Sequence, residues 1–304
     1  MKFIIRRLVL TVLTLWVVFT ISFALKRGVP GGPFSAEKKI PEFIKRNIEK
    51  RYRMDQPLHV QYAEELWHTI CLDFGPSLKL EDFTVNEILA AGFPVSASLG
   101  IFALFFALTL GLVAGTLSAV NRNSLVDVSL MSVATVGIAV PNFVLASLCV
   151  VVFVFWLQLL PTGGWGTLRQ IVLPALCLGA PFAAYVARLT RAGVLEVLHL
   201  DYVRTAYAKG MLAKDVIIKH VMKGAILPVV TYIGPATAGI LTGSLVLERV
   251  FNIPGLGSHL VDSATQRDYP LTTGLVMTYT FLLCLMNLLV DISYAMIDPR
   301  VKAD

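Results

Sequence analysis

Apolar residues fall in six long runs that carry few charges, and shorter segments rich in Lys, Arg, Asp and Glu separate them. The runs are residues 8–25, 94–119, 129–156, 170–187, 224–247 and 271–290. The shortest runs hold 18 residues, and a helix of that length rises about 27 Å, close to a hydrocarbon core of about 30 Å. The pattern therefore predicts an all-α polytopic membrane protein with six transmembrane helices.

Composition agrees with this prediction and excludes a soluble globule. Of the 304 residues, 56% are hydrophobic and 15% charged, against about 25% charged in soluble domains; the mean hydropathy is +0.72. The net charge of +6 comes from bases that flank the apolar runs and form no stripe interleaved with aromatics, so we expect no nucleic-acid partner. The four scattered cysteines indicate neither a disulfide framework nor a zinc site.

The distribution of Lys and Arg predicts that both termini are cytoplasmic. With the N-terminus inside, 13 bases lie on each side, but ten of the external ones belong to the loop 26–87. Loops this long largely escape the positive-inside rule, and without it the count is 13 inside against 3 outside. The first run exceeds the usual length of a signal-peptide core, so it is expected to stay as an anchor.

Three regions follow: residues 1–25 as an N-terminal segment and first span, 26–87 as an extracytoplasmic loop, and 88–304 as a five-helix core. In the loop, Pro41 can begin an amphipathic surface helix. Its apolar face would hold Phe43, Ile44, Ile48 and Tyr52. This helix is either a cover on the external span ends or a docking surface for an extracytoplasmic partner. The breaker-rich residues 160–166 predict an external turn.

Proline and glycine recur inside the apolar runs. They are Pro94, Pro141, Pro174, Pro181, Pro228 and Pro235, with Gly111/Gly115 and Gly239/Gly243 at small-xxx-small spacing. Such residues allow kinks and close approach of membrane helices. Two interpretations remain open: ordinary helix packing, or helices that rock against each other around a pathway.

Residues 188–223 form the only long cytoplasmic loop, with seven bases and three acids. Leu195, Leu198, Tyr202 and Ala206 keep helical spacing up to Lys209-Gly210, a basic last turn and a glycine stop. A second helix is expected near Asp215, whose carboxylate can pair with Lys219. The hairpin has small residues at its bend: Ala206, Ala208 and Gly210. It either docks in a groove on another protein or is a solvated amphipathic linker attracted to anionic lipid headgroups.

Sequence motifs for enzymatic chemistry are missing. There is no Walker A loop, no His-Glu-x-x-His and no Gly-x-Ser-x-Gly, and the five histidines show no metal-ligand spacing. We therefore expect no catalytic residue, metal or cofactor. The charged residues nearest the runs are expected at span ends, where water or lipid headgroups can reach them; they are Asp127, Glu248, Arg249 and Asp291. Ion-coupled secondary transporters usually hold ionisable groups inside the spans, so an external energy source is favoured over ion coupling, which stays the alternative.

Several short stretches together resemble a known family. Arg204-Thr205-Ala206, Gly210 and then Ile226-Leu227-Pro228 are similar to the cytoplasmic loop signature of ABC importer permeases. Three further stretches resemble the peptide-uptake branch of the oligopeptide-permease type. These are Asp73-Phe74-Gly75-Pro76-Ser77, Pro254-Gly255-Leu256-Gly257 with Arg267-Asp268-Tyr269-Pro270, and Asp298-Pro299-Arg300. Two departures from the general signature are usual in that branch: Arg204 replaces Glu, and the spacing from Gly210 to Pro228 is longer. At the position of Tyr207, that branch often has Arg.

The resemblance implies a type I importer permease fold that forms half of a 12-helix pathway for oligopeptides in a bacterial inner membrane; dipeptides or nickel are the alternative substrates. It implies four partners besides membrane lipid: a second homologous permease, two cytoplasmic ATP-binding subunits and an extracytoplasmic peptide-binding protein. ATP hydrolysis would take place on the partner chains. Coupling to them would rest on Arg204, Thr205, Ala206, Tyr207, Lys209 and Gly210. Pathway residues are not assigned.

Overall fold

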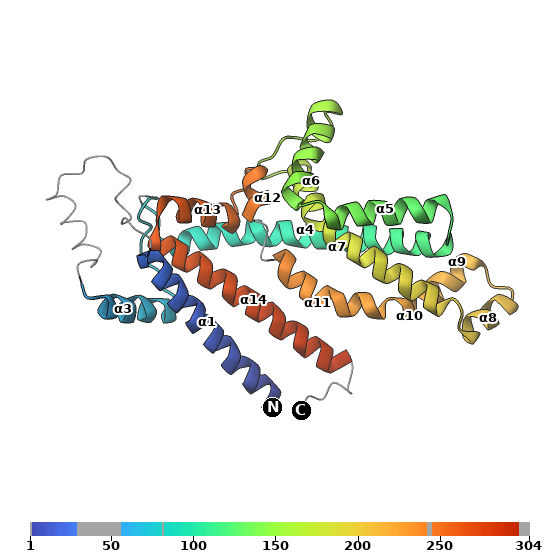
Figure 1. The fold of residues 1–304 in the computed structure, drawn as a ribbon, viewed down its shortest axis with the longest axis horizontal. Coiled ribbons are helices and arrows are strands. Elements are labelled where there is room, and N and C mark those ends of the chain that lie inside the picture. Colours follow the sequence, from blue (N-terminus) through green and yellow to red (C-terminus); the bar gives the residue numbers. More distant parts are fainter. Residues whose placement is uncertain (1, 29–55, 81, 242–244, 298–304) are drawn as a thin grey trace. The chain divides into compact units, whose positions relative to one another are not determined.

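The computed structural model describes residues 2–28, 56–80, 82–241 and 245–297. In this part the chain is helical, with one isolated extended bridge between Pro76 and Thr84 (Figure 1). The elements are α1 (Lys2–Gly28), α3 (Leu58–Ile70), α4 (Val85–Val120), α5 (Leu125–Ala139), α6 (Asn142–Cys149), the π-helical η1 (Val150–Trp156), α7 (Leu168–Val197), α8 (Asp201–Ala208), α9 (Ala213–Val216), the π-helical η2 (Ile217–Val221), α10 (Met222–Ala225), α11 (Leu227–Leu241), α12 (Leu245–Val250), α13 (Leu256–Gln266) and α14 (Tyr269–Ile297). The amphipathic helix expected from Pro41 and the stretch at residues 298–300 lie outside the described residues.

The described helices divide into two compact units. Of the described residues, the first unit holds 2–28, 56–80, 82–95 and 255–285, and the second holds 96–241, 245–254 and 286–297. The first unit contains α1, α3 and α13, and the second contains the helices from α5 to α12. The long helices α4 and α14 each contribute residues to both units.

By length and composition, the described helices confirm an all-α polytopic fold. Four of them, α1, α4, α7 and α14, are long and apolar enough to cross a membrane, and two bent helix pairs bring the count to six if each is one span. The run expected at 129–156 is not one straight helix, because α5 meets the α6–η1 pair at 116°. Val140 before Pro141 is extended, with φ −85° and ψ 127°, as the residue before a proline is biased to be.

The span expected over residues 224–247 contains α11 and has a bend at its start. Residues Ala213–Ala225 and Leu227–Thr237 form the second bent pair, at 57°. Residues 213–223, the end of the segment predicted as a cytoplasmic loop, are therefore part of this pair. Pro228 lies in the first turn of α11, where its missing N–H breaks no helical hydrogen bond.

In the first unit, α3 packs on the second half of α1 through aromatic contacts. The Tyr62 ring meets the rings of Phe19 and Phe23 edge-on at 5.4 and 5.3 Å between centroids. The Tyr62 hydroxyl lies 2.8 Å from the Thr20 hydroxyl. The hydrophobic pattern did not predict this helix. A second cluster joins α4, α13 and α14, with Val85, Ile88, Leu256, Leu271 and Leu275 buried.

In the second unit, α4 and α7 approach closely at the glycine pair Gly111/Gly115. A Cβ atom on Gly115 would lie 2.4 Å from the carbonyl oxygen of Ala187, and one on Gly111 would lie 2.6 Å from the Val186 side chain. No side chain fits at such distances, so both positions require glycine. The small-xxx-small spacing here reflects direct packing between helix backbones.

Candidate functional site

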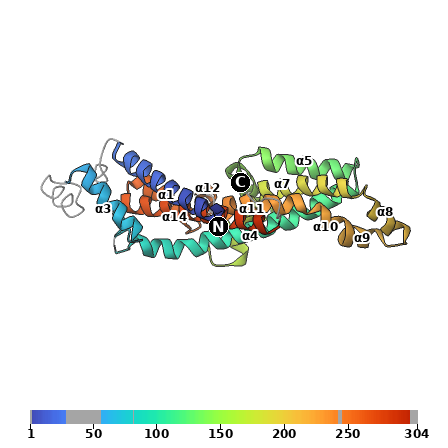
Figure 2. The same cartoon turned by 90° about the horizontal axis from the view of Figure 1, so that it is seen from below.

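The segment expected to couple to a partner lies on α8 and the turn after it. The expectation of one helix from Leu195 to Lys209 was wrong: α7 ends at Val197, and α8 begins at Asp201 after a short turn. Asp201 places a carboxylate in the first turn of α8 and lies 3.5 Å from the Arg204 guanidinium. In Figures 1 and 2, α8 and α9 lie together at one end of their unit.

The bend after α8 forms at Gly210, as the sequence predicted. Gly210 has φ +77°, a left-handed conformation that costs other residues about 1–2 kcal/mol. Its N–H bonds to the Tyr207 carbonyl at 2.9 Å, and the Met211 N–H reaches back to Ala206. Beyond the bend, the predicted pair of Asp215 and Lys219 is confirmed at 3.0 Å.

The six residues predicted for coupling divide into an inward and an outward set. Ala206 is buried, together with Val203, in a cluster that joins the ends of α4 and α7 to α9 and α10. We expected Ala206 to form part of an exposed surface of small side chains, which is wrong. Its methyl group instead packs in this cluster and holds α8 against the neighbouring helices. The other five are exposed: Arg204, Thr205, Tyr207, Lys209 and Gly210.

Two carboxylates expected within reach of water are instead buried in the second unit. Asp127 is 4% exposed and accepts hydrogen bonds from Arg191 on α7. Glu248 is 0% exposed and accepts one from the Ser96 hydroxyl at 2.9 Å. Arg249 is exposed, and the side chain of Asp291 lies outside the described residues.

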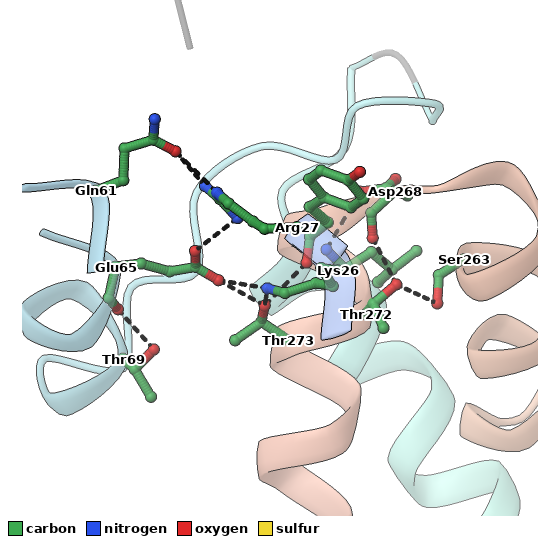
Figure 3. Close-up of polar contacts among 11 residues, drawn as sticks. Lys26, Arg27, Gln61, Glu65, Thr69, Ser263, Asp268, Thr272 and Thr273 are labelled. Atoms are coloured by element: carbon green, nitrogen blue, oxygen red, sulfur yellow. Dashed lines mark hydrogen bonds and ion pairs between the residues drawn. The ribbon is translucent and has the colours of Figure 1, made fainter. Parts of the chain in front are cut away.

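A polar pocket of about 450 Å³ lies in the first unit, where the end of α1 meets α3 and the start of α14 (Figure 3). Lys26 and Arg27 occupy the last turn of α1, where cations suit the helix dipole. The Lys26 ammonium bonds to Glu65 at 2.5 Å and also contacts the Thr273 hydroxyl. Arg27 bonds to the Gln61 side-chain oxygen, and its guanidinium lies 4.3 Å from the Phe23 ring centroid.

The loop at residues 73–78 forms another part of the pocket wall, and Asp268 holds it in place. The Asp268 carboxylate is buried, and it accepts hydrogen bonds from the Ser77 hydroxyl and the backbone N–H of Leu78 and Lys79. Its other oxygen accepts the Leu271 N–H and so caps α14. Two of the stretches that resemble the peptide-uptake branch, 73–77 and 267–270, thus form one structure beside the pocket.

Sequence reasoning did not single out this pocket. Its polar residues come from α1, α3, the loop after α3 and α14, and no single local motif contains them all. The sequence offered two signals. The pair Lys26-Arg27 directly follows an apolar run, and the stretches 73–77 and 267–270, noted only for their resemblance to a family, both contribute lining residues. In the described part of the chain, no group of three or more His, Cys, Asp and Glu residues is placed to hold a metal ion.

Comparison with known proteins identifies the family. Residues 88–303, more than two thirds of the chain, match the model of the binding-protein-dependent transport system inner membrane component. The chain belongs to this family. Over 304 residues, this permease is 44% identical to the oligopeptide transport system permease protein OppB of Haemophilus influenzae and 42% identical to that of Escherichia coli, with 99% of each chain covered. It is 42% identical to the dipeptide transport system permease protein DppB of Bacillus subtilis, covering 99% of this chain and 98% of the relative.

Two solved structures share the fold of the permease. An inward-facing MetNI methionine ABC transporter matches with a TM-score of 0.54 at 18% identity, over 71% of this chain and 97% of that one. An amino acid ABC transporter with histidines matches with a TM-score of 0.52 at 17% identity, over 71% and 95% of the two chains. The type I importer permease fold expected from the sequence is therefore confirmed.

Proposed function

We propose that this chain is the permease subunit that forms half of the translocation pathway of an ATP-driven peptide importer. The observation that carries the proposal is 42–44% identity over 99% of both chains to permease proteins of oligopeptide transport systems. The equally similar dipeptide relative leaves the length of the preferred peptide as the question for experiment.

Coupling to the ATP-binding subunits is assigned to Arg204, Thr205, Tyr207, Lys209 and Gly210, with Ala206 as their internal support. Five exposed residues on one short helix and its turn, fixed from below by Val203 and Ala206, suit a rigid surface that docks in a partner's groove. The apolar side chains Leu212 and Tyr202 beside them are 73% and 46% exposed. Such an exposed apolar patch is typical of a protein–protein contact.

The proposed complex contains this chain, a second homologous permease, two cytoplasmic ATP-binding subunits and an extracytoplasmic peptide-binding protein, in a bacterial inner membrane. Mild detergent extraction of the tagged chain followed by mass spectrometry tests it. We expect a second six-span permease and ATP-binding chains in stoichiometric amounts. Recovery of the chain alone, under conditions that keep other membrane complexes intact, would favour the ion-coupled alternative.

Both termini are proposed to be cytoplasmic, which places α8 inside and the polar pocket outside. A membrane-impermeant thiol reagent tests this in a Cys71→Ser background, because Cys71 is exposed and the other three cysteines are partly or fully buried. Added from outside, the reagent should modify Thr162→Cys in the turn before α7 and leave Ala208→Cys unmodified. The reverse labelling pattern would overturn the orientation.

The substrate class is tested with the reconstituted complex. Di-, tri- and tetrapeptides should raise the rate of ATP hydrolysis when the binding protein is present, and the most effective length distinguishes an oligopeptide from a dipeptide importer. Nickel salts serve as the matched non-peptide substrate. Stimulation by nickel and by no peptide would contradict the peptide assignment.

A further inference from the structure

Two long helices of the second unit differ in the side chains that they expose. Within residues 171–191 of α7, the exposed residues are Tyr185 and Arg188. Within residues 96–120 of α4, every exposed residue is large and apolar; they are Ile101, Phe105, Leu110, Val113, Leu117 and Val120. An apolar surface like that of α4 suits contact with lipid tails or with another apolar helix. The exposed face of α7 instead carries polar groups.

The exposed face of α7 lies where the helix is otherwise apolar. Tyr185 belongs to the apolar run 170–187, and Arg188 follows it directly. The two residues are three positions apart, so they lie on the same side of the helix. Polar and charged side chains in membrane spans almost always face the interior of the helix bundle or a water-filled cavity, because hydrocarbon offers them no hydrogen bonds. This side of α7 is therefore expected to border water.

The helix α11 packs on α7 and brings a second tyrosine to the same place. The ring centroids of Tyr185 and Tyr232 lie 5.6 Å apart, and the ring planes are inclined by 36°. Nearby, the Phe182 ring lies 3.7 Å from where a Cβ atom on Gly239 would be. Between positions 228 and 240, the described residues that α11 exposes are small: Pro228, Thr231, Pro235 and Gly239. We call the surface that carries Tyr185, Arg188 and Tyr232 the tyrosine face.

The two phenol groups of the tyrosine face have hydroxyls that are open to a ligand. Within the described residues, neither the Tyr185 nor the Tyr232 hydroxyl takes part in a hydrogen bond. A phenol hydroxyl can both donate and accept. A peptide backbone carries an N–H donor and a C=O acceptor at nearly every residue, whatever its sequence. Two neighbouring hydroxyls therefore match the backbone of a peptide without selecting among its side chains.

We propose that the tyrosine face lines the translocation pathway, and that the Tyr185 and Tyr232 hydroxyls hydrogen-bond to the backbone of the peptide in transit. The inference rests on the proposed function, because that function makes a peptide the occupant of the pathway. Neutral hydrogen bonds suit a surface that the substrate must leave again, since their net gain over bonds to water is small. The apolar face of α4 is left to lipid or to the second permease.

Photo-crosslinking tests the contact directly. A photoreactive benzoylphenylalanine replaces Tyr185 in the complete importer, which is reconstituted in vesicles with ATP and the binding protein. Illumination during uptake of radiolabelled tri-alanine should attach the label to this chain. The matched control carries the same group in place of Phe105, an exposed aromatic residue of α4, and should stay unlabelled. Attachment of position 185 to lipid or to the second permease without labelled peptide would overturn the proposal, as would equal labelling at both positions.

Removal of the hydroxyls separates contact with the peptide from a structural role. Tyr185→Phe and Tyr232→Phe keep both rings and break no hydrogen bond of the described chain, so both variants should unfold at the wild-type midpoint. Each should slow tri-alanine uptake about two- to tenfold, because the peptide then has one fewer replacement for its bonds to water. Thr135→Val, which removes an exposed hydroxyl from α5, should match wild-type uptake. Wild-type uptake by both Phe variants would contradict the hydrogen bonds to the peptide.

The outcomes separate this inference from the proposed function. If the wild-type complex with its binding protein takes up no peptide, the proposed function fails. If uptake is normal, but no peptide attaches at position 185 and both Phe variants transport at the wild-type rate, the assignment of the tyrosine face alone is wrong.

Discussion

Arg191 on α7 donates two hydrogen bonds to the Asp127 carboxylate at the start of α5, from Nε to Oδ1 and from Nη2 to Oδ2, both 2.8 Å long. The Asp127 carboxylate also accepts bonds from the Ser118 hydroxyl and the Asn123 N–H. One carboxylate thus ties the end of α4, the α4–α5 turn and α7 together. Arg191 lies one turn before Val194, a member of the buried cluster that holds α8. The pair therefore fixes α5 against the helices that carry the proposed coupling segment.

Replacing Asp127 by Asn should destabilise the chain by about 1.5–3 kcal/mol, the usual contribution of hydrogen bonds to a charged group. The variant keeps the shape of the side chain but leaves Arg191 without its counter-charge. Thermal unfolding of the detergent-purified chain measures the loss. The control is Asp215→Asn, which breaks the exposed i,i+4 pair with Lys219 and should cost about 0.3–0.5 kcal/mol. Equal losses in the two variants would show that the pair with Arg191 has no special role.

Exchanging the two residues, Asp127→Arg with Arg191→Asp, should not restore stability. The exchange keeps the ion pair, but the Ser118 hydroxyl and the Asn123 N–H would then face a guanidinium, which has no acceptor atom. Unfolding of the double variant should therefore resemble that of Asp127→Asn. Recovery of the wild-type midpoint would mean that charge attraction alone, without the two extra donors, accounts for the pair.

The close approach of α4 and α7 makes Gly115 intolerant of a side chain. Gly115→Ala should destabilise the chain by about 1–3 kcal/mol through overpacking, because the new Cβ would lie 2.4 Å from the Ala187 carbonyl. Gly239→Ala is the matched helical control: its Cβ would lie 3.7 Å from the Phe182 ring, an ordinary contact. That change should be neutral or stabilising, because alanine loses less backbone freedom in a helix. Unfolding midpoints check both, and a stable Gly115→Ala chain would contradict the packing.

The spans could be predicted because their cause is local. Uncharged runs of sufficient length specify α1, α4, α7 and α14 by themselves, and Lys209-Gly210 is a local stop signal for α8. The bend at Pro141 could be anticipated as a kink, but not its angle of 116°, since helix packing rather than proline sets the direction that the chain takes.

The features that sequence reasoning missed depend on partners far along the chain. The inward residues of α3 include Gln61, Tyr62, Glu65 and Thr69, so a search for apolar periodicity cannot find the helix. In the sequence, Asp127 and Glu248 are typical of water-facing acids at span ends. In the structure, Arg191 and Ser96 on other helices hydrogen-bond to their carboxylates. The polar pocket forms only where α1, α3 and α14 come together, and no local sequence pattern predicts that these helices are in contact.

His259 on α13 should make the stability of the chain sensitive to acid. Burial lowers the pKa of its imidazole below the ordinary 6.5, although the nearby Asp262 carboxylate raises it in part. The unfolded chain therefore binds this proton more readily than the folded chain, and stability is lost as pH falls through 6.5. The unfolding midpoint of His259→Gln should fall less between pH 7.5 and 5.5 than that of the wild type. His199→Gln, at an exposed histidine, should keep the wild-type pH profile, and identical profiles for all three would contradict the prediction.

At Gly210, two substitutions can separate the effect of a bulky side chain on the proposed coupling surface from the effect of backbone strain. A Cβ at this position meets nothing within 4 Å, while its φ of +77° strains any L-residue. Gly210→Ala and Gly210→Trp should therefore lose similar stability, about 1–2 kcal/mol, but differ in function. In the assembled complex, Trp should abolish peptide-stimulated ATP hydrolysis, and Ala should retain most of it, because only the indole obstructs a partner's groove.

Gly166→Trp, at another open glycine with positive φ, is the control and should leave stimulation intact. If Trp and Ala at position 210 give equal stimulation, no partner contacts this surface closely, and the coupling role of α8 is wrong.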